Sequence, residues 1–248
     1  MLLRNIIFSA LLVGLIAGLI LSIGQHFQVS KIIHEAEKHE VTKAAFFAAQ
    51  HEKLQHTHTH EHDENTWAPE DGSERFFYTT VADILSGIGF ATILISFMAG
   101  ARTRRAQNYS IPQGLLWGIA GFAAVFVAPS LGLHPEIPGM EAAALEPRQM
   151  WWSITVFVTI IGIALLAFAP SWNKLGGLTI IAIPHLVGAP NITTATFTHP
   201  DPQAVIALTQ LHHEFLWATS ITNGIFWVIL GGLSALILSK WQWHNETE

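Results

Sequence analysis

Residues 111–133 read IPQGLLWGIAGFAAVFVAPSLGL, and this stretch of 23 residues contains no charged side chain. A helix rises about 1.5 Å per residue, so about 20 apolar residues cross the roughly 30 Å hydrocarbon core of a bilayer. A helix on the surface of a soluble domain needs a polar face, which this stretch lacks. The stretch therefore predicts a transmembrane helix.

Similar apolar runs occur along the rest of the chain. Those long enough for a membrane span cover residues 5–23, 84–101, 150–172 and 215–239. A further run, 175–189, is short and contains Pro184, which interrupts a regular helix. We therefore predict an all-α integral membrane protein, a polytopic helical bundle of about six spans whose fifth span is short, broken or re-entrant.

The first run, 5–23, has a second interpretation as a cleaved signal, because Ser22-Ile23-Gly24 has the small-x-small form of a cleavage site. Its apolar core exceeds the roughly 7 to 15 residues of a typical signal. We expect a retained span and divide the chain into three parts: a first span (1–27), an external His- and Glu-rich loop (28–77) and a bundle of about five spans (78–248).

The composition supports this division. Charged residues make up 12% of the chain, against roughly 25% in soluble domains, and half of them lie between Lys31 and Arg75. The absence of cysteine excludes a disulfide-stapled secreted module, and the scarcity of basic residues excludes a nucleic-acid-binding protein. A polar segment is thus set into an apolar protein.

Basic residues in short loops predict the orientation, because such loops stay in the cytoplasm. Arg102, Arg104 and Arg105 occupy one short connection between two spans. With six spans, both termini are then cytoplasmic and the polar segment 28–77 is external.

The external segment is rich in histidine, with eight of the 14 histidines lying between His26 and His62. In an extended chain, alternate side chains point to the same side. Imidazole binds divalent zinc, nickel and cobalt. Four histidines at alternate positions therefore predict metal binding, the alternative being a polar linker that is rich in histidine by composition alone. They are His56, His58, His60 and His62.

A second cluster of metal-ligating residue types is expected to continue the first helix beyond the membrane. It contains His34, Glu35, Glu37 and His39. Residues three or four apart share a helix face, so Glu35 can act with His39, and His34 with Glu37. The alternative is a solvated helix stabilised by pairs of Glu and Lys.

Ionisable residues within membrane spans are costly and therefore indicate function. Asp83 lies near the outer end of the second span, and His185 follows Pro184 in the short fifth. His26 closes the first span, and His213 and Glu214 open the last. We predict that these five residues line a path for a divalent cation, although residues at span ends can also reach water by extending their side chains.

The sequence does not have the motifs of two enzyme classes. Three residues separate His34-Glu35 from His39, so the H-E-x-x-H zinc-protease spacing is not met, and the chain contains no G-x-x-x-x-G-K-[ST] phosphate loop. We therefore predict that the protein is not an enzyme and does not hydrolyse ATP by that route.

Several short motifs follow one another along the chain. They are Glu35-x-Glu37-x-x-Glu40, Trp67-Ala68-Pro69-Glu70-Asp71-Gly72-x-Glu74-Arg75, Asp83 followed by Gly87-x-Gly89-Phe90, Pro138-Gly139, Arg148-Gln149-x-Trp151-Trp152 and Pro184-His185-Leu186-Val187-Gly188-Ala189-Pro190. In this order they resemble the CbtA family, predicted cobalt transporter subunits of bacterial inner membranes.

The resemblance implies uptake of cobalt for cobalamin synthesis, beside a small one-span membrane protein, CbtB, that carries histidines of its own. The histidine run 56–62 falls in a variable part of the family's loop. The residues that match family motifs are Glu35, Glu37, Asp71, Glu74, Arg75, Arg148 and His185. Independently of the family, Asp71-Gly72 predicts a turn back to the membrane, after which Glu74 and Arg75 can pair.

The residues and the resemblance together predict a divalent metal transporter or permease subunit, with cobalt as the first choice and nickel or zinc as alternatives. We expect no permanently bound cofactor. The expected partners are the metal ion, the lipid bilayer and a CbtB-like protein, and a homo-oligomer stays open. The rival interpretations are a membrane-anchored buffer that delivers metal to another transporter, and a metal- or haem-containing enzyme using His26, His185 and His213.

Overall fold

The structure is a computed structural model that describes residues 2–53, 69–105, 109–192 and 196–245. Across these residues the secondary structure is helical, apart from one isolated β-bridge between Met140 and Phe197. Five helices are long and apolar enough to cross a membrane: Leu3–Gln50, Ser73–Ala101, Ile111–Ser130, Leu145–Phe168 and Pro202–Trp241. The prediction of an all-α, multi-pass membrane protein is confirmed at this level.

The N-terminal part forms one continuous helix. It consists of α1 (Leu2–Gly24), the π-helical segment η1 (Gln25–Val29) and α2 (Ser30–Lys53). About 50 residues at about 1.5 Å each give a helix of about 75 Å, far longer than the roughly 30 Å hydrocarbon core. The charged helix α2 therefore projects beyond the bilayer, which confirms the expectation that residues 34–40 continue the first helix.

Helices α1, α3 (Ser73–Arg105) and α8 (Pro202–Asn245) enclose the main hydrophobic core. Its fully buried side chains include Val13, Ile95, Met98, Phe226 and Leu230. Gly14 and Gly18 stand where α1 crosses α3, because small residues allow helix backbones to approach closely in a membrane.

A second close crossing joins α8 to α4 (Ile111–Phe122), which continues through η2 (Ala123–Val127) and α5 (Ala128–Ser130). A Cβ atom placed on Gly118 would lie 2.2 Å from the carbonyl oxygen of Trp227, so no larger residue fits without moving a backbone. The helix formed by the apolar stretch that begins at residue 111 thus needs glycine to pack against α8.

The remaining helices, α6 (Leu145–Phe168) and α7 (Asn173–Val187), form a hairpin. Helix α7 corresponds to the predicted fifth span. Its 15 residues give about 22 Å, and it is not among the five helices that qualify as spans. Pro184 lies in its last turn without interrupting it, and the helix ends where Gly188 adopts a φ of 87°. The predicted short helix is therefore present as α7, and it is short because it ends at Val187 and not because Pro184 breaks it.

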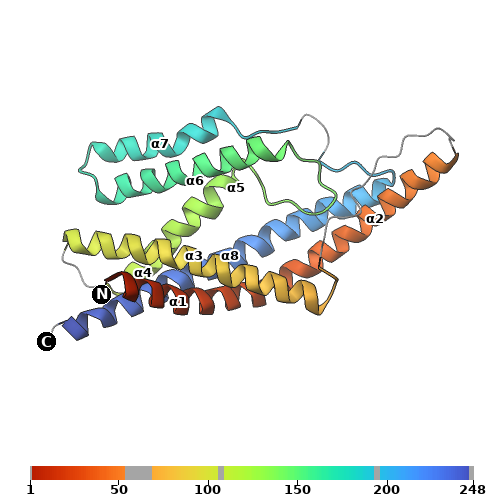
Figure 1. Cartoon of the computed structure of the whole chain (residues 1–248). Coiled ribbons are helices and arrows are strands. Elements are labelled where there is room, and N and C mark those ends of the chain that lie inside the picture. Colours follow the sequence, from red (N-terminus) through yellow and green to blue (C-terminus); the bar gives the residue numbers. More distant parts are fainter. Residues whose placement is uncertain (1, 54–68, 106–108, 193–195, 246–248) are drawn as a thin grey trace.

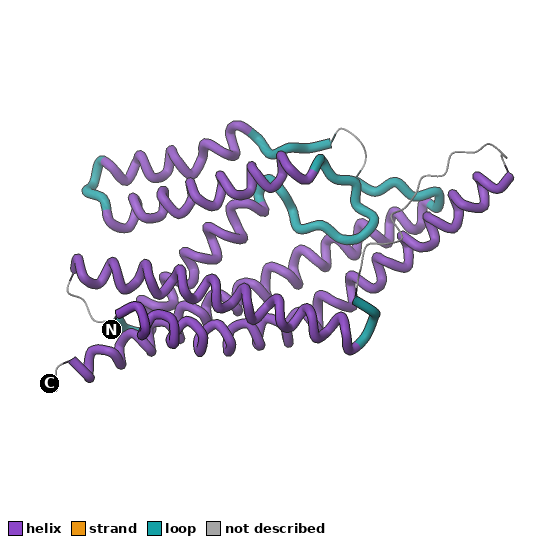
Figure 2. Tube along the Cα trace, viewed as in Figure 1, coloured by secondary structure: helices purple, strands orange, loops and turns teal. Residues whose placement is uncertain are grey.

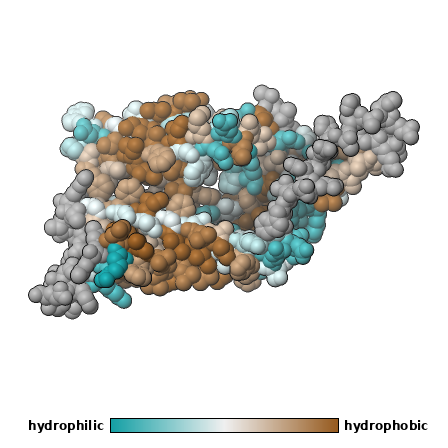
Figure 3. Space-filling view, viewed as in Figure 1, coloured by the Kyte–Doolittle hydropathy of each residue, from teal (hydrophilic) through white to brown (hydrophobic). Residues whose placement is uncertain are grey.

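The helices run between two ends of the molecule. Both termini, the end of α3 and the turn between α6 and α7 lie at one end, whereas α2 and the longer loops lie at the other (Figure 1). Most of the loop segments gather at this second end (Figure 2). On the face drawn in Figure 3, hydrophobic side chains cover the middle of the bundle and hydrophilic ones lie towards the ends. This distribution is the one expected for a bundle surrounded by lipid.

Candidate metal site

A cluster of metal-ligating side chains lies where α2 passes the start of α3. His34 and Glu37 belong to α2, and Asp71 belongs to the turn before α3. One ligand atom from each residue lies within 4.8 Å of the other two. Metal bonds of about 2.1 Å require ligand atoms no more than about 4.2 Å apart, so small side-chain movements would close the cluster around an ion. We call these three residues the outer cluster.

The local sequence explains how the outer cluster forms. His34 and Glu37 are three residues apart and share one face of α2. Gly72 has a φ of 100°, a conformation that favours glycine, and α3 begins at the next residue. The predicted turn at Asp71-Gly72 is confirmed, and it brings Asp71 to the face of α2 that carries His34 and Glu37.

Hydrogen bonding prepares the His34 ring to bind a metal. Its Nδ1 atom lies 2.8 Å from the carbonyl oxygen of Ser30, an acceptor only, so in the neutral ring Nδ1 carries the hydrogen and Nε2 the free electron pair. Nε2 lies 3.7 Å from Asp71 Oδ1. Metal-binding histidines are commonly held by a carbonyl in this way, with the other nitrogen pointing at the ion.

Arg75 binds both carboxylates of the outer cluster. Its guanidinium donates two hydrogen bonds to Glu37, at 3.1 and 2.5 Å, and one to Asp71 at 2.8 Å. The expected pairing of Arg75 with Glu74 is not formed, because neighbouring residues on a helix point in different directions. Glu74 instead accepts a hydrogen bond from the backbone N–H of Glu70 at 3.0 Å. An ion entering the cluster therefore meets two carboxylates whose negative charge one guanidinium balances in part.

The other predicted ligands of α2 face elsewhere. Glu35 pairs with Lys38 at 2.5 Å, and the ring of His39 lies edge-on to that of His199, with centroids 6.4 Å apart. The alternating histidines of segment 28–77 lie outside the described residues, and their role stays a prediction. They are His56, His58, His60 and His62.

The predicted path residues lie on different helices. Asp83 of α3 is 8% exposed; its Oδ1 accepts a hydrogen bond from Gln25 at 3.2 Å, and its Oδ2 has no partner among the described residues. His185 of α7 packs edge-on against Trp151, and its Nε2 atom is likewise buried without a hydrogen-bond partner in the described chain. Two of the five path residues thus carry buried polar atoms without a described partner.

The remaining three path residues are exposed. His26 packs edge-on against Phe76, with ring centroids 4.8 Å apart. His213 borders a shallow pocket on α8, and Glu214 accepts a hydrogen bond from Gln210 at 3.0 Å. The structure does not bring these residues together with Asp83 or His185 in one described cluster.

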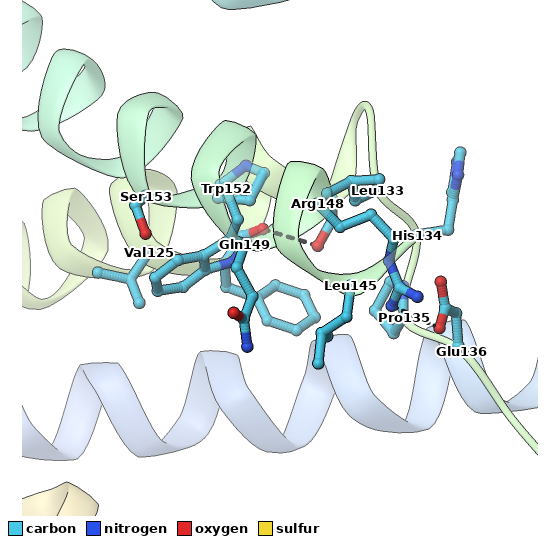
Figure 4. A pocket seen from close by; sticks show the side chains of 13 residues that line it. Val125, Leu133, His134, Pro135, Glu136, Leu145, Arg148, Gln149, Trp152 and Ser153 are labelled. Carbon is cyan, nitrogen blue, oxygen red and sulfur yellow. Dashed lines mark hydrogen bonds and ion pairs between the residues drawn. The ribbon is translucent and has the colours of Figure 1, made fainter. Parts of the chain in front are cut away.

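A cavity of about 630 Å³ lies between η2, α6 and the loop after α5 (Figure 4). Apolar side chains such as Leu133 and Trp152 line it together with polar ones. Arg148, which matches a family motif, pairs here with Glu136 at 2.7 Å. Glu136 is the one carboxylate among the described lining residues and Arg148 balances its charge, whereas the outer cluster has two carboxylates for one guanidinium, so the cavity is the weaker candidate for binding a cation.

Ion pairs and hydrogen bonds also connect α2 to the loops beyond the bundle. Lys43 donates to Thr198 at 3.0 Å and to Glu141 at 3.4 Å, and Thr198 donates to Glu141 at 2.8 Å. The hydrogen bond from Thr198, followed by the hydrogen bond and charge of Lys43, lowers the pKa of Glu141. These contacts hold α2 in place relative to the loops.

A bundle with five apolar helices long enough to cross a membrane is the arrangement of a multi-pass membrane protein. The chain matches the CbtA family, described as a probable cobalt transporter subunit, over residues 3–239. It therefore belongs to the CbtA family. No curated protein and no solved structure matches the chain.

The helical spacing of His34 and Glu37 predicts them as ligands, but it does not add Asp71 and Arg75 to their cluster. One signal was available, since Asp71 and Arg75 are four residues apart and can pair across the start of a helix. The pairing of Arg75 with Glu37 is a contact between distant parts of the chain, and a single sequence does not reveal it.

Proposed function

We propose that this CbtA-family chain carries divalent cobalt across a bacterial inner membrane and receives the ion at the outer cluster. The observation that supports this most strongly is the convergence of His34, Glu37 and Asp71, with ligand atoms within 4.8 Å of one another. The choice of cobalt rests on the family description, because imidazole and carboxylate ligands also suit nickel and zinc.

The chemistry of the outer cluster suits capture followed by release. One neutral imidazole nitrogen and two carboxylates supply three ligands, which leaves positions for water on an octahedral ion. Arg75 competes for the same two carboxylates, which weakens the binding of the ion. A transport site has to release its ion, so moderate affinity is an advantage here.

The distribution of basic residues supports an external position for the outer cluster. Arg4 near the N-terminus, the end of α3 at Arg105, Lys174 and Lys240 belong to segments at the end of the molecule that holds both termini (Figure 1). By the positive-inside rule this end is cytoplasmic. The opposite end, with the outer cluster, then faces outward.

We propose further that the ion passes into the bundle by ligand exchange at His185, one of the path residues predicted from the sequence. His185 has a buried nitrogen available for this role. His26, His213 and Glu214 lie on exposed surfaces and would serve the approach. A chain carrying His185→Ala should then accumulate less cobalt in cells, and unchanged uptake would exclude His185 from the path.

Cobalt flux into proteoliposomes tests the function directly. The full chain should carry cobalt, and flux should fall at least tenfold for His34→Ala or for Glu37→Gln. Each variant removes one of three ligands, and the loss of even a residue that hydrogen-bonds to a ligand typically costs about 10- to 100-fold in metal affinity or activity. Glu40→Gln is the matched control, since Glu40 lies exposed on the same helix outside the outer cluster. Equal flux in all four proteins would contradict the proposal.

The histidine-rich segment has a separate test. Replacing residues 56–62 by Gly and Ser should raise the cobalt concentration for half-maximal uptake if these histidines collect the ion. Unchanged rate and half-maximal concentration would identify the segment as a linker.

A second candidate function follows from the word subunit in the family description. The chain would then bind cobalt and pass it to a partner, such as a CbtB-like one-span protein or another copy of the chain. This version predicts cobalt binding without flux when the chain is reconstituted alone, and flux when the partner is added. In both versions we propose no catalytic activity and no permanently bound cofactor.

A further inference from the structure

Asp83 is a buried carboxyl group in the membrane-spanning part of α3. The residue is 8% exposed, and its Oδ2 atom has no hydrogen-bond partner among the described residues. Its Oδ1 atom accepts one hydrogen bond, from the uncharged amide of Gln25 at 3.2 Å. An isolated buried carboxylate is very costly, and such a group tends to become neutral by taking up a proton.

The groups around Asp83 are polar but uncharged. Ser22 lies 2.7 Å from Thr80, whose hydroxyl donates to the carbonyl of Phe76, so Ser22 is the donor to Thr80. A Cβ atom on Gly18 would lie 2.7 Å from the backbone oxygen of Asp83, which shows how closely α1 approaches α3 at this level. The carboxyl group is therefore enclosed between two tightly packed helices.

The charged and titratable residues of the packed elements are engaged elsewhere. From η1, the His26 ring packs against Phe76. Arg75, two turns earlier on α3, binds Glu37 and Asp71. On α8, Glu214 accepts from Gln210, and His212 lies 3.1 Å from the carbonyl of Pro135. Among the described residues no cation pairs with Asp83.

We propose that Asp83 is a proton-binding site, and that the proton there is linked to the metal bound at the outer cluster. The binding step is balanced by itself: the carboxylate takes up one proton to become a neutral carboxylic acid, and releases it again. The first part of the proposal stands on the burial of Asp83 alone. The linkage rests on the proposed cobalt function.

The linkage follows from the helices that the two sites share. Gln25, the partner of Asp83, and His34 lie on one continuous helix, nine residues or about 13 Å apart. The π-helical segment Gln25–Val29 lies between them, and such segments occur frequently at functional sites. Asp71 and Arg75 likewise lie just before and at the start of the helix that carries Asp83.

Electrostatics gives the direction of the linkage. A divalent ion at the outer cluster favours the ionised form of Asp83, so cobalt binding releases the proton. By reciprocity, protonation of Asp83 weakens cobalt binding by the same factor. This direction is the one needed to exchange a proton for a metal ion across the membrane.

Infrared difference spectroscopy of the full chain in lipid nanodiscs tests the proton site. The wild-type chain should show a carboxylic-acid C=O band that shifts with aspartate-specific isotope labelling and disappears as pH is raised. The band should be absent in Asp83→Asn, shifted in Asp83→Glu and unchanged in Glu74→Gln. A wild-type chain without an isotope-sensitive band, or a band that survives in Asp83→Asn, would overturn the assignment.

Addition of cobalt at constant pH tests the linkage. The band should decrease on cobalt addition in the wild type and stay constant in His34→Ala. A band unaffected by cobalt, while calorimetry shows that cobalt binds at the outer cluster, would refute the linkage. If calorimetry finds no binding that depends on His34, the proposed function fails and the linkage with it, whereas a titrating Asp83 band would still establish the proton site.

Discussion

Arg75→Gln is the substitution whose effect separates a metal site from a purely structural ion pair. The guanidinium lies within hydrogen-bonding distance of Glu37 and Asp71, so an ion bound to the same carboxylates would sit about 5 Å from it. Removing the guanidinium charge should therefore tighten cobalt binding. If Arg75 formed only a structural ion pair, removing its charge would not tighten cobalt binding.

The size of the effect follows from Coulomb's law. The side chain of Asp71 is 70% exposed and those of Arg75 and Glu37 are 33% and 30% exposed, so a water-like dielectric constant of about 80 gives the lower limit of the effect. A divalent ion and a monovalent cation about 5 Å apart then repel each other by about 1.7 kcal/mol, equivalent to a change in Kd of about 15- to 20-fold. The same change should lower the stability of the protein by about 1 kcal/mol, because a partly exposed ion pair is lost.

Calorimetric titration of the detergent-solubilised chain with cobalt measures this change in Kd. Arg75→Lys, which keeps the charge, should stay close to the wild type, and Arg148→Gln, which breaks the ion pair with Glu136, should leave cobalt affinity unchanged. If Arg75→Gln is folded and binds cobalt no more tightly than the wild type, the guanidinium and the metal do not share the two carboxylates.

Two further predictions concern the fold. Gly118→Ala should destabilise the bundle by about 1–3 kcal/mol, because the added Cβ would meet the carbonyl oxygen of Trp227. Gly89→Ala is the control and should not destabilise the bundle, because no atom lies within 4 Å of the added Cβ. Equal thermal stability of both variants would contradict the crossing described for α4 and α8. The pKa of Glu141 is lowered by Thr198, so its contribution to stability exists above the ordinary pKa of glutamate and is lost as pH falls through the lowered value. The protection of the 196–199 loop against hydrogen exchange, measured relative to the intrinsic exchange rate at each pH, should therefore fall at acid pH in the wild type, and this fall should be missing in Glu141→Gln.

The apolar runs predicted most of the fold because the bilayer limits the choice to helices of a given length. Residues 111–133 are charge-free, and the structure contains a helix over Ile111–Ser130 that can cross a membrane. The fifth span was predicted as short, and α7 is 15 residues long. The effect of Pro184 was less predictable, since a proline near the end of a helix can lie in the last turn without interrupting it.

The outer cluster was only half predictable. The spacing of His34 and Glu37 placed them on one helix face, because helical periodicity is a local property. Asp71 and Arg75 reach them through the packing of α2 beside the start of α3, which depends on the tertiary structure. Their family motif indicated that the residues matter, but not which contacts they make.

Anomalous X-ray scattering at the cobalt absorption edge, from crystals of the full chain grown with cobalt, locates the bound ion. We expect an anomalous peak within bonding distance of His34 Nε2 and of carboxylate oxygens of Glu37 and Asp71, with the Arg75 side chain turned away. Peaks at other sites, with Arg75 still bound to both carboxylates and no cobalt beside His34, would contradict this expectation.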